Sequence, residues 1–303
     1  MNRLPVLGCL LFCISSMAFS YSEIYFPELD PVKEIPAKPI KREEIRNFKL
    51  TGEQSKQVKQ LNSTVISYYD KYNNELESMR DYFDDKGNKT DAQKWKYIYE
   101  GTFLTSFTIN YSEDVFESGN CFYDSNKRMK PVIYKNNFSQ EYSDVSSKKD
   151  TLKYDSENRL VEVESLMGNG HFIISKFSYD DYGNMEESTI YDEIGNIRDR
   201  DAYIYKNGVL SKSTFEEYVT SYDENNPYTK IEAEYDVNRR VIKEISEIKN
   251  VNNTESQIQI YIYRYKNNFL GDWIEKSKFK YYSNGITEKL ILSEMATRDM
   301  KYW

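Results

Sequence analysis

A short phrase that recurs along the chain constrains its fold more than any other feature. The phrase is a tyrosine, often an aspartate, two or three polar residues, a glycine or asparagine, and then an apolar residue. Clear copies begin at Tyr154, Tyr179, Tyr191, Tyr205, Tyr235, Tyr265 and Tyr282, and weaker copies span 82–88, 99–104, 123–129 and 134–138. Aspartate or asparagine caps a tight turn, and glycine or asparagine tolerates its positive φ. Each copy therefore predicts a chain reversal between two strands.

The residues between the turns alternate in character. Val161 and Val163 alternate with Glu162 and Glu164, and apolar residues also alternate with polar ones over 257–263. A period of two residues indicates strands with two distinct faces. The sequence predicts an all-β fold, an antiparallel meander of repeated β-hairpins.

A Tyr-Ile-Tyr triplet occurs three times in these predicted strands. On neighbouring strands the triplets would form cross-strand tyrosine ladders, in which each aromatic pair contributes about 0.2–1 kcal/mol. The first interpretation is structural, and the second is an exposed face that grips sugar rings or apolar peptide side chains. The candidate partner-binding residues are Tyr97, Tyr99, Tyr203, Tyr205, Tyr261 and Tyr263.

The form Tyr-Asp-x-x-Gly-Asn at Tyr179 and Tyr191, with its looser relatives over 82–285, resembles the YD repeats of the bacterial Rhs family. The resemblance implies a coiling sheet of β-hairpins in an exported protein that makes surface contacts or wraps a cargo. This chain is short and lacks a recognisable toxin-like C-terminus, which argues against encapsulation. A loose Tyr-x-x-Gly-x-Leu pattern of other short bacterial repeats is an equal match.

The N-terminus has the order of a secretory signal. Arg3 precedes an apolar run from Val6 to Phe19, and Ala18-Phe19-Ser20 fits the small-x-small cleavage rule. We expect residues 1–20 to be removed, and a lipoprotein signal ending at Cys9 is the alternative. Because no later run of about 18 apolar residues exists, the mature chain should have no transmembrane helix.

The segment 21–63 is predicted to be an extended tether. It holds four of the seven prolines, which fix φ and cannot donate to a sheet ladder. A short helix from Thr51 to Leu61 is a further expectation, with Thr51 as the N-cap and Gln54 three positions on. The β-hairpin repeat domain would then cover 64–303.

Composition limits the classes of function. The chain has 41 basic and 49 acidic side chains and no basic stripe, so nucleic acid is not an expected partner. Its 28 tyrosines suit half-buried strand surfaces. We expect mixed charges in the strands, such as Lys276, Lys278 and Lys280, to keep sheet edges soluble and apart.

Few residues offer catalytic or metal chemistry. After cleavage Cys121 is the one cysteine, expected to be buried or half-buried, and His171, the single histidine, should lie in a turn. Glu162 and Glu164 should share a strand face about 7 Å apart, as a solvated pair and not a glycosidic pair. The acidic turns 84–88 and 180–184 lack full calcium-loop alternation. We expect no enzyme, no cofactor and no metal.

The sequence thus predicts an exported, non-enzymatic binding protein, periplasmic, surface-exposed or extracellular, that presents a tyrosine-rich sheet to a glycan or protein. A structural envelope protein without a small ligand is the alternative. A membrane β-barrel is a third reading, which the final strand disfavours because it lacks apolar alternation toward lipid.

Overall fold

The structure, a computed structural model, describes residues 36, 38–51, 57–101, 103–111, 115–130, 133–136, 149–166, 172–218, 229–249, 256–283 and 288–303. The predicted signal sequence, His171 and the ends of the phrases at 134–138 and 282–286 lie outside these residues. In the described part, no helix is long and apolar enough to cross a membrane.

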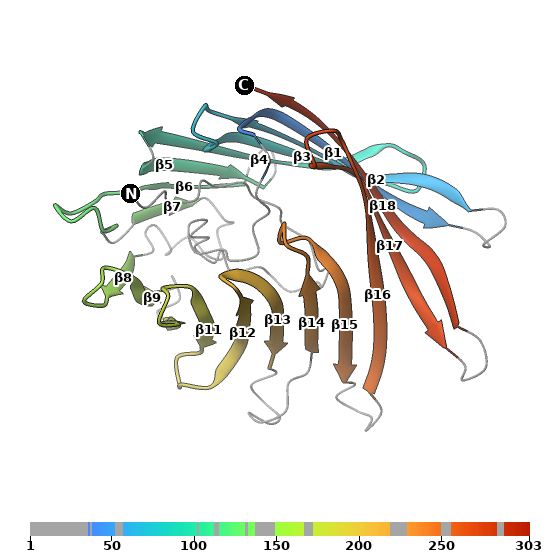
Figure 1. Cartoon of the computed structure of the whole chain (residues 1–303). Coiled ribbons are helices and arrows are strands. Elements are labelled where there is room, and N and C mark those ends of the chain that lie inside the picture. The colour runs from blue at the N-terminus through green and yellow to red at the C-terminus, as the bar shows by residue number, and fades with distance from the viewer. Residues whose placement is uncertain are drawn as a thin grey trace.

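The described chain forms one antiparallel sheet, which confirms the predicted fold class (Figure 1). Its strands are β1 (Ile40–Thr51), β2 (Val58–Tyr69), β3 (Glu75–Phe83), β4 (Lys89–Glu100), β5 (Phe103–Asn110), β6 (Phe116–Asn120), β7 (Ile133–Asn136), β8 (Lys149–Tyr154), β9 (Leu160–Leu166), β10 (Phe172–Tyr179), β11 (Met185–Tyr191), β12 (Ile197–Lys206), β13 (Val209–Glu217), β14 (Thr229–Tyr235), β15 (Val241–Lys249), β16 (Ser256–Asn267), β17 (Trp273–Ser283) and β18 (Glu288–Tyr302).

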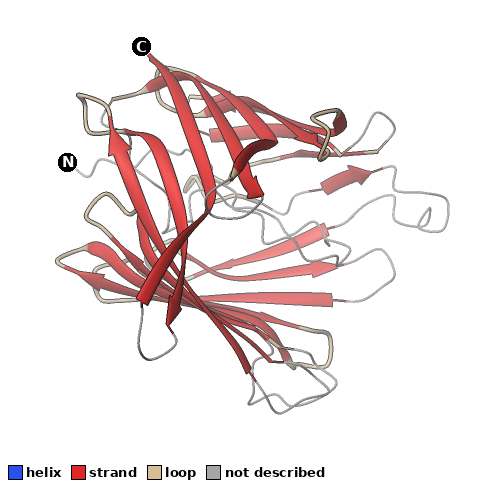
Figure 2. Cartoon of the chain, turned by 90° about the vertical axis from the view of Figure 1, so that its right-hand side faces the viewer, coloured by secondary structure: helices blue, strands red, loops and turns tan. Residues whose placement is uncertain are grey.

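The strand pairing runs in a circuit. Each strand pairs with the next along the chain, and β1 pairs with both β2 and β18. The circuit is narrowest between β7 and β8, where the described residues make one pair, Ile133 with Lys149. Figures 1 and 2 show the sheet curving through a wide arc, with the C-terminal strand beside the first one.

The N-terminal prediction is wrong in two respects. The sheet begins at Ile40 and not near residue 64, and residues 58–61 belong to strand β2 instead of a helix. Phe48 and Leu50 of β1 pair with Leu61 and Lys59 of β2. This pairing with a neighbouring strand overrides the weak local preference for a short isolated helix.

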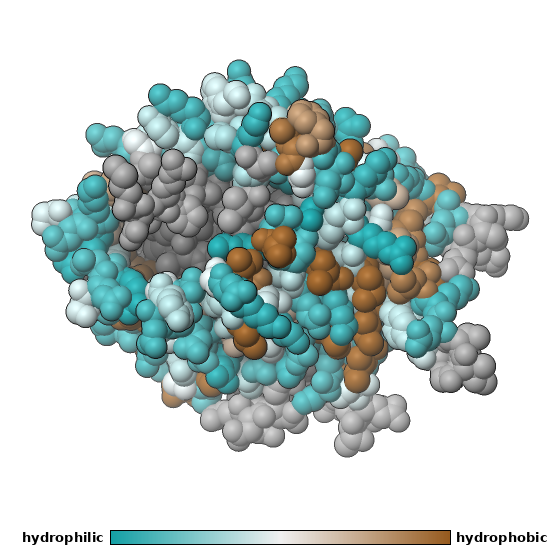
Figure 3. All heavy atoms as spheres, in the orientation of Figure 1, coloured by the Kyte–Doolittle hydropathy of each residue, from teal (hydrophilic) through white to brown (hydrophobic). Residues whose placement is uncertain are grey.

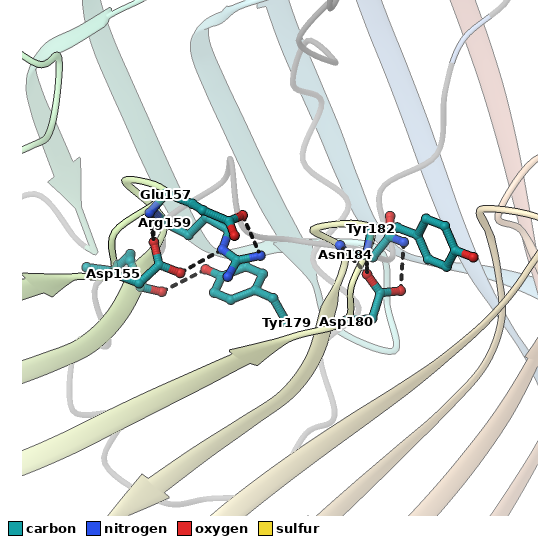
Figure 4. A network of polar contacts seen from close by, with 8 residues as sticks. Asp155, Glu157, Arg159, Tyr179, Asp180, Tyr182 and Asn184 are labelled. Carbon is teal, nitrogen blue, oxygen red and sulfur yellow. Dashed lines mark hydrogen bonds and ion pairs between the residues drawn. The ribbon is translucent and has the colours of Figure 1, made fainter.

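The repeated turn works through its aspartate. The Asp180 backbone amide donates to the carbonyl of Asn184 at 2.9 Å, and the amide of Gly183 donates to the carbonyl of Asp180 at 3.0 Å. The Asp180 carboxylate accepts the amides of Tyr182 and Asn184 through Oδ1 and the Asn184 side-chain amide through Oδ2, as Figure 4 shows. The same backbone pair of bonds closes the turns that begin at Asp70, Asp84, Asp124, Asp155, Asp192 and Asp236.

These turns confirm the hairpin prediction and add two details. The turn at Asp70 has the same backbone hydrogen bonds, although the sequence pattern does not predict a turn there. In the turn at Asp236, the positive φ of 61° falls on Arg239, not on Asn238 as the phrase suggests. The turn needs the left-handed residue three places after its aspartate, whatever residue stands there.

At five turns, the tyrosine that precedes the turn joins its hairpin to the preceding one. The Tyr179 hydroxyl donates to the carbonyl of Leu160 at 2.7 Å, and the Arg159 guanidinium lies 4.9 Å from the centre of the Tyr179 ring (Figure 4). Asp155 holds that arginine through Oδ2 at 2.7 Å. Tyrosines reach back to the preceding hairpin in the same way at Tyr123, Tyr154, Tyr205 and Tyr265.

The acceptor in each of these bonds is an apolar residue that follows a turn, and this explains the end of the phrase. Met129, Leu160 and Met185 are all buried. The apolar residue supplies core volume while its carbonyl anchors the next hairpin. At these five copies the phrase therefore fixes a turn, an apolar position and a link to the neighbouring hairpin.

Two small clusters of buried residues lie in the described part of the sheet. One contains Cys121, Met129, Leu160 and Val163, which confirms that Cys121 is buried. The other contains Ile45 of β1 with Trp273 of β17 and Ala296 of β18, so it joins the first strand to the last two.

A buried ion pair adjoins the second cluster. Arg298 of β18 hydrogen-bonds Glu43 of β1, and the two side chains are 6% and 4% exposed. Tyr69 donates to the same carboxylate at 3.1 Å, and the arginine lies 4.9 Å from the ring centre of Trp273. The polar groups that join the first and last strands are thus bonded to one another away from water.

Candidate partner-binding face

Strand register places the six candidate tyrosines on one face of the sheet. Directly paired residues of antiparallel strands share a face. Tyr203 connects to Tyr261 through the successive pairs Ser213, Ala233 and Glu244. The face continues from Tyr265 to β4 and Tyr97 through Lys276, Ala296, Asn47, Ser63, Tyr82 and Asp91. We call this surface the tyrosine face.

The tyrosine face lies toward the inside of the arc. Of the buried residues in the described strands, all but Thr189 and Ser277 are on it. None of the six tyrosines is fully exposed: Tyr263 is buried and the other five are half-buried. The isoleucines between them point to the opposite face, where Ile98 and Ile204 are 51% and 55% exposed. A partner would meet the tyrosines within the curve of the sheet.

The tyrosine hydroxyls take part in internal hydrogen bonds. Tyr205 donates to the carbonyl of Met185 at 2.9 Å, and Tyr263 donates to Glu244 at 2.8 Å. Burial, followed by the charge of Glu244, raises the pKa of Tyr263, and burial also raises the pKa of Tyr261. These phenols are therefore protonated near neutral pH and act as hydrogen-bond donors.

Three lysines of β17 lie directly opposite three tyrosines of β16. The pairs are Tyr265 with Lys276, Tyr263 with Lys278, and Tyr261 with Lys280. The Lys276 ammonium is 4.8 Å from the Tyr263 ring centre, and that of Lys278 is 4.1 Å from the Tyr261 ring centre.

This arrangement corrects the expectation that these lysines protect a sheet edge. Lys276 is 5% exposed, and all three lysines lie within the face of a sheet whose β17 is paired on both sides. Such cation–π contacts strengthen when desolvated. The sequence shows the alternation of both strands, but only the register reveals that the two alternations meet.

The opposite surface, which we call the charged face, carries ion pairs. Lys153 contacts Glu162 at 2.5 Å, Arg200 contacts Glu187 at 2.5 Å, and Lys94 contacts Glu77 at 2.8 Å. Apolar residues interrupt it on the last strands, where Ile258 is 62% exposed, and Figure 3 shows such apolar areas within a largely hydrophilic surface. Water-exposed ion pairs of this kind suit solubility.

The other residues considered for catalytic or metal chemistry lie on the charged face or in turns. Glu162 and Glu164 lie on the charged face, and Glu162 is bound to Lys153. The aspartates of the turns 84–88 and 180–184 accept amide hydrogens. Within the described ranges, no group of three or more His, Cys, Asp or Glu residues is placed to hold a metal ion.

Comparison with known proteins assigns no family. No protein-family model matches the chain, and no curated protein matches it in sequence.

Similar solved structures share little sequence with the chain. A porin-like protein from Bacteroides uniformis has 9% identity and a TM-score of 0.41 over 88% of this chain and 98% of its own. A porin-like protein from Bacteroides vulgatus has 9% identity and a TM-score of 0.35 over 85% and 97%. The TcdB2–TccC3 structure without its hypervariable C-terminal region has 9% identity and a TM-score of 0.36, covering 82% of this chain and 15% of that one.

Proposed function

We propose that the protein is an exported, non-enzymatic binding protein of a bacterial envelope, which holds a glycan or protein partner against the tyrosine face. One observation carries the proposal: the three Tyr-Ile-Tyr triplets, spread over more than 160 positions of sequence, have their tyrosines on one face. Five of these six rings keep part of their surface accessible. Tyrosine offers a large rigid contact area together with a polar end, which suits recognition.

The triplets contain their own control. Tyr97→Ala and Tyr203→Ala remove rings from the tyrosine face, whereas Ile98→Ala and Ile204→Ala remove exposed side chains of the same strands from the charged face. We expect the tyrosine variants to weaken binding of the purified mature chain to immobilised glycans or envelope proteins, and the isoleucine variants to bind as the wild type does. Loss of binding in the isoleucine variants alone would place the partner on the charged face and overturn the proposal.

A structural envelope protein without a ligand is the second candidate. It is favoured by the hydroxyls of Tyr205 and Tyr263, whose internal hydrogen bonds give these tyrosines a role in the sheet itself. If the protein has this structural function, the tyrosine variants should lower the stability of the fold, and the wild type should bind no glycan or envelope protein. Protease treatment of intact cells separates the locations: release of peptides from the strands indicates surface exposure, and cleavage only after envelope disruption indicates the periplasm.

A further inference from the structure

One end of the tyrosine face is cationic on a chain whose net charge is −8. The strand pairs bring lysines from β1, β17 and β18 to this end. The β17 lysines occupy every second position, so their side chains lie on the tyrosine face. The strand pairing places the lysines of β18 and β1 on the same face. These lysines are Lys49, Lys276, Lys278, Lys280 and Lys289.

The carboxylates among these lysines are fewer. Glu294 pairs with Lys49 on one side and with Lys278 on the other, and Lys278 also lies 3.8 Å from Glu244. In the described strands of this part of the sheet, two carboxylates, Glu294 and Glu244, lie among the five lysines. Lys49 and Lys289 are exposed and Lys280 is half-buried, so the positive charge is accessible to a ligand.

Several neighbouring side chains are polar and uncharged. Gln257 and Gln259 of β16 continue the row that contains Tyr261, and Gln60 of β2 pairs with Lys49. Tyr282, paired with Lys289, is 45% exposed. Amides and phenols bond hydroxyl groups, and ammonium groups bond carboxylates. The centres of protein–protein interfaces, in contrast, are depleted of lysine and rich in apolar contact.

We propose that this end of the tyrosine face binds an acidic glycan, a polysaccharide that carries carboxylates. The inference rests on the proposed binding function and names the class of ligand. Lys278 and Lys280, at alternate positions of β17, stand about 7 Å apart, and the exposed Lys49 and Lys289 lie on nearby strands, so these lysines form a row of charges that meets successive carboxylates of an extended polymer. Tyr261, Tyr282 and the glutamines contact its hydroxyls and ring faces.

The test uses polygalacturonate as the probe and dextran as its neutral counterpart, with binding to the mature chain measured by titration calorimetry. We expect polygalacturonate to bind, more weakly as salt increases, and dextran to bind far less. The double variant Lys49→Gln/Lys280→Gln should weaken polygalacturonate binding at least tenfold, because each charge-assisted bond to a carboxylate is strong. Both substitutions avoid the buried Lys276.

The matched control is Lys266→Gln. Lys266 is an exposed lysine of β16 on the charged face, so its loss makes the net charge of the chain more negative by one without changing a lysine of the tyrosine face. Equal weakening by Lys266→Gln and by the double variant would reduce the effect to general electrostatics and overturn the site. Circular dichroism of each variant shows whether the sheet persists.

Failures of the two proposals give different results. Binding of dextran that is lost in Tyr97→Ala, with no preference for polygalacturonate, would overturn the acidic class and keep the tyrosine face. Tighter binding of poly-glutamate than of polygalacturonate would overturn the glycan in favour of an acidic peptide. Binding of polygalacturonate that is insensitive to all tyrosine-face variants would overturn both.

Discussion

The junction of the first and last strands and the junction of β7 with β8 are opposites in construction. β1 and β18 pair from Ile40 to Lys49 and enclose the Glu43–Arg298 ion pair beside Trp273. β6 and β7 are short strands, and Ile133 with Lys149 is the one described pair between β7 and β8. The strongest side-chain network therefore joins the strands that are farthest apart in sequence, where chain connectivity gives no help.

The largest expected effect is at the terminal junction. Arg298→Met removes one partner of the buried pair and leaves Glu43 without its cation, which should lower the free energy of unfolding by about 3–5 kcal/mol. Urea unfolding followed by circular dichroism measures the loss. The double variant Glu43→Gln/Arg298→Met should recover part of it, since no buried charge is then left unpaired. A loss below about 1 kcal/mol in the single variant would contradict a structural role for the pair.

Truncation of core side chains should cost less free energy of unfolding, and least near β7 and β8. Leu210, which is 1% exposed, should lose about 2–4 kcal/mol on substitution by alanine, because the site cannot refill. Met129→Ala, in the cluster near β7 and β8, should lose less, because methionine packs loosely and that junction relaxes more easily. The same urea titration compares the two variants, and a greater loss for Met129→Ala would contradict the looser packing expected near β7 and β8.

Hydrogen exchange separates the junctions without substitution. Amides of β1 and β18 should exchange near the global unfolding rate, and amides of β6 to β8 should exchange faster through local opening. Mass spectrometry of peptic peptides measures both. Equal exchange rates at the two junctions would show that the short pairing between β7 and β8 does not cause local opening.

Two turn residues give small effects of opposite sign. Gly195 has a φ of 91°, so Gly195→Ala should cost about 1 kcal/mol, whereas Arg239→Gly removes a side chain from a φ of 61° and should stabilise by up to about 1 kcal/mol. Thermal unfolding compares the pair. A loss in both variants would mean that Arg239 contributes more through its side chain than its backbone costs.

The smallest effect concerns acid. Hydrogen bonds from the Asn184 side chain, and then from the backbone, lower the pKa of Asp180. A carboxylate with a lowered folded-state pKa favours the fold above its unfolded pKa near 3.9, and this contribution is lost as pH falls through the folded value. NMR titration should show Asp180 titrating below the usual range, and Asn184→Ala should move its pKa upward. An unchanged midpoint would contradict the carboxylate contacts.

Local features could be predicted from the sequence, and long-range ones could not. The turn phrase and the two-residue period identify hairpins and faces because both depend on neighbours within a few residues. Glu43 and Arg298 are 255 positions apart, and nothing in either segment indicates its partner. β1 escaped prediction because prolines up to Pro39 suggested a continuing tether.

The candidate site followed the same division. The triplets at Tyr97, Tyr203 and Tyr261 were visible as repeats, and their common face follows from register. The lysines of β17 looked like soluble edge residues, because their pairing with Tyr261, Tyr263 and Tyr265 depends on which strand lies beside β17 and at what offset. The alternation of residues within one strand shows neither which strand is its neighbour nor the register between them.

The bond from five of the turn tyrosines to the preceding hairpin has a consequence for how such a chain changes in length. Because Tyr179 needs only the carbonyl of Leu160, and a new hairpin would offer the same carbonyl, duplication or deletion of one whole hairpin preserves every link of this kind. Insertion or deletion of one strand would reverse the direction of the final strand, which could then no longer pair antiparallel with β1. Evolution of this architecture should therefore proceed in units of two strands, and related chains should differ by even strand numbers.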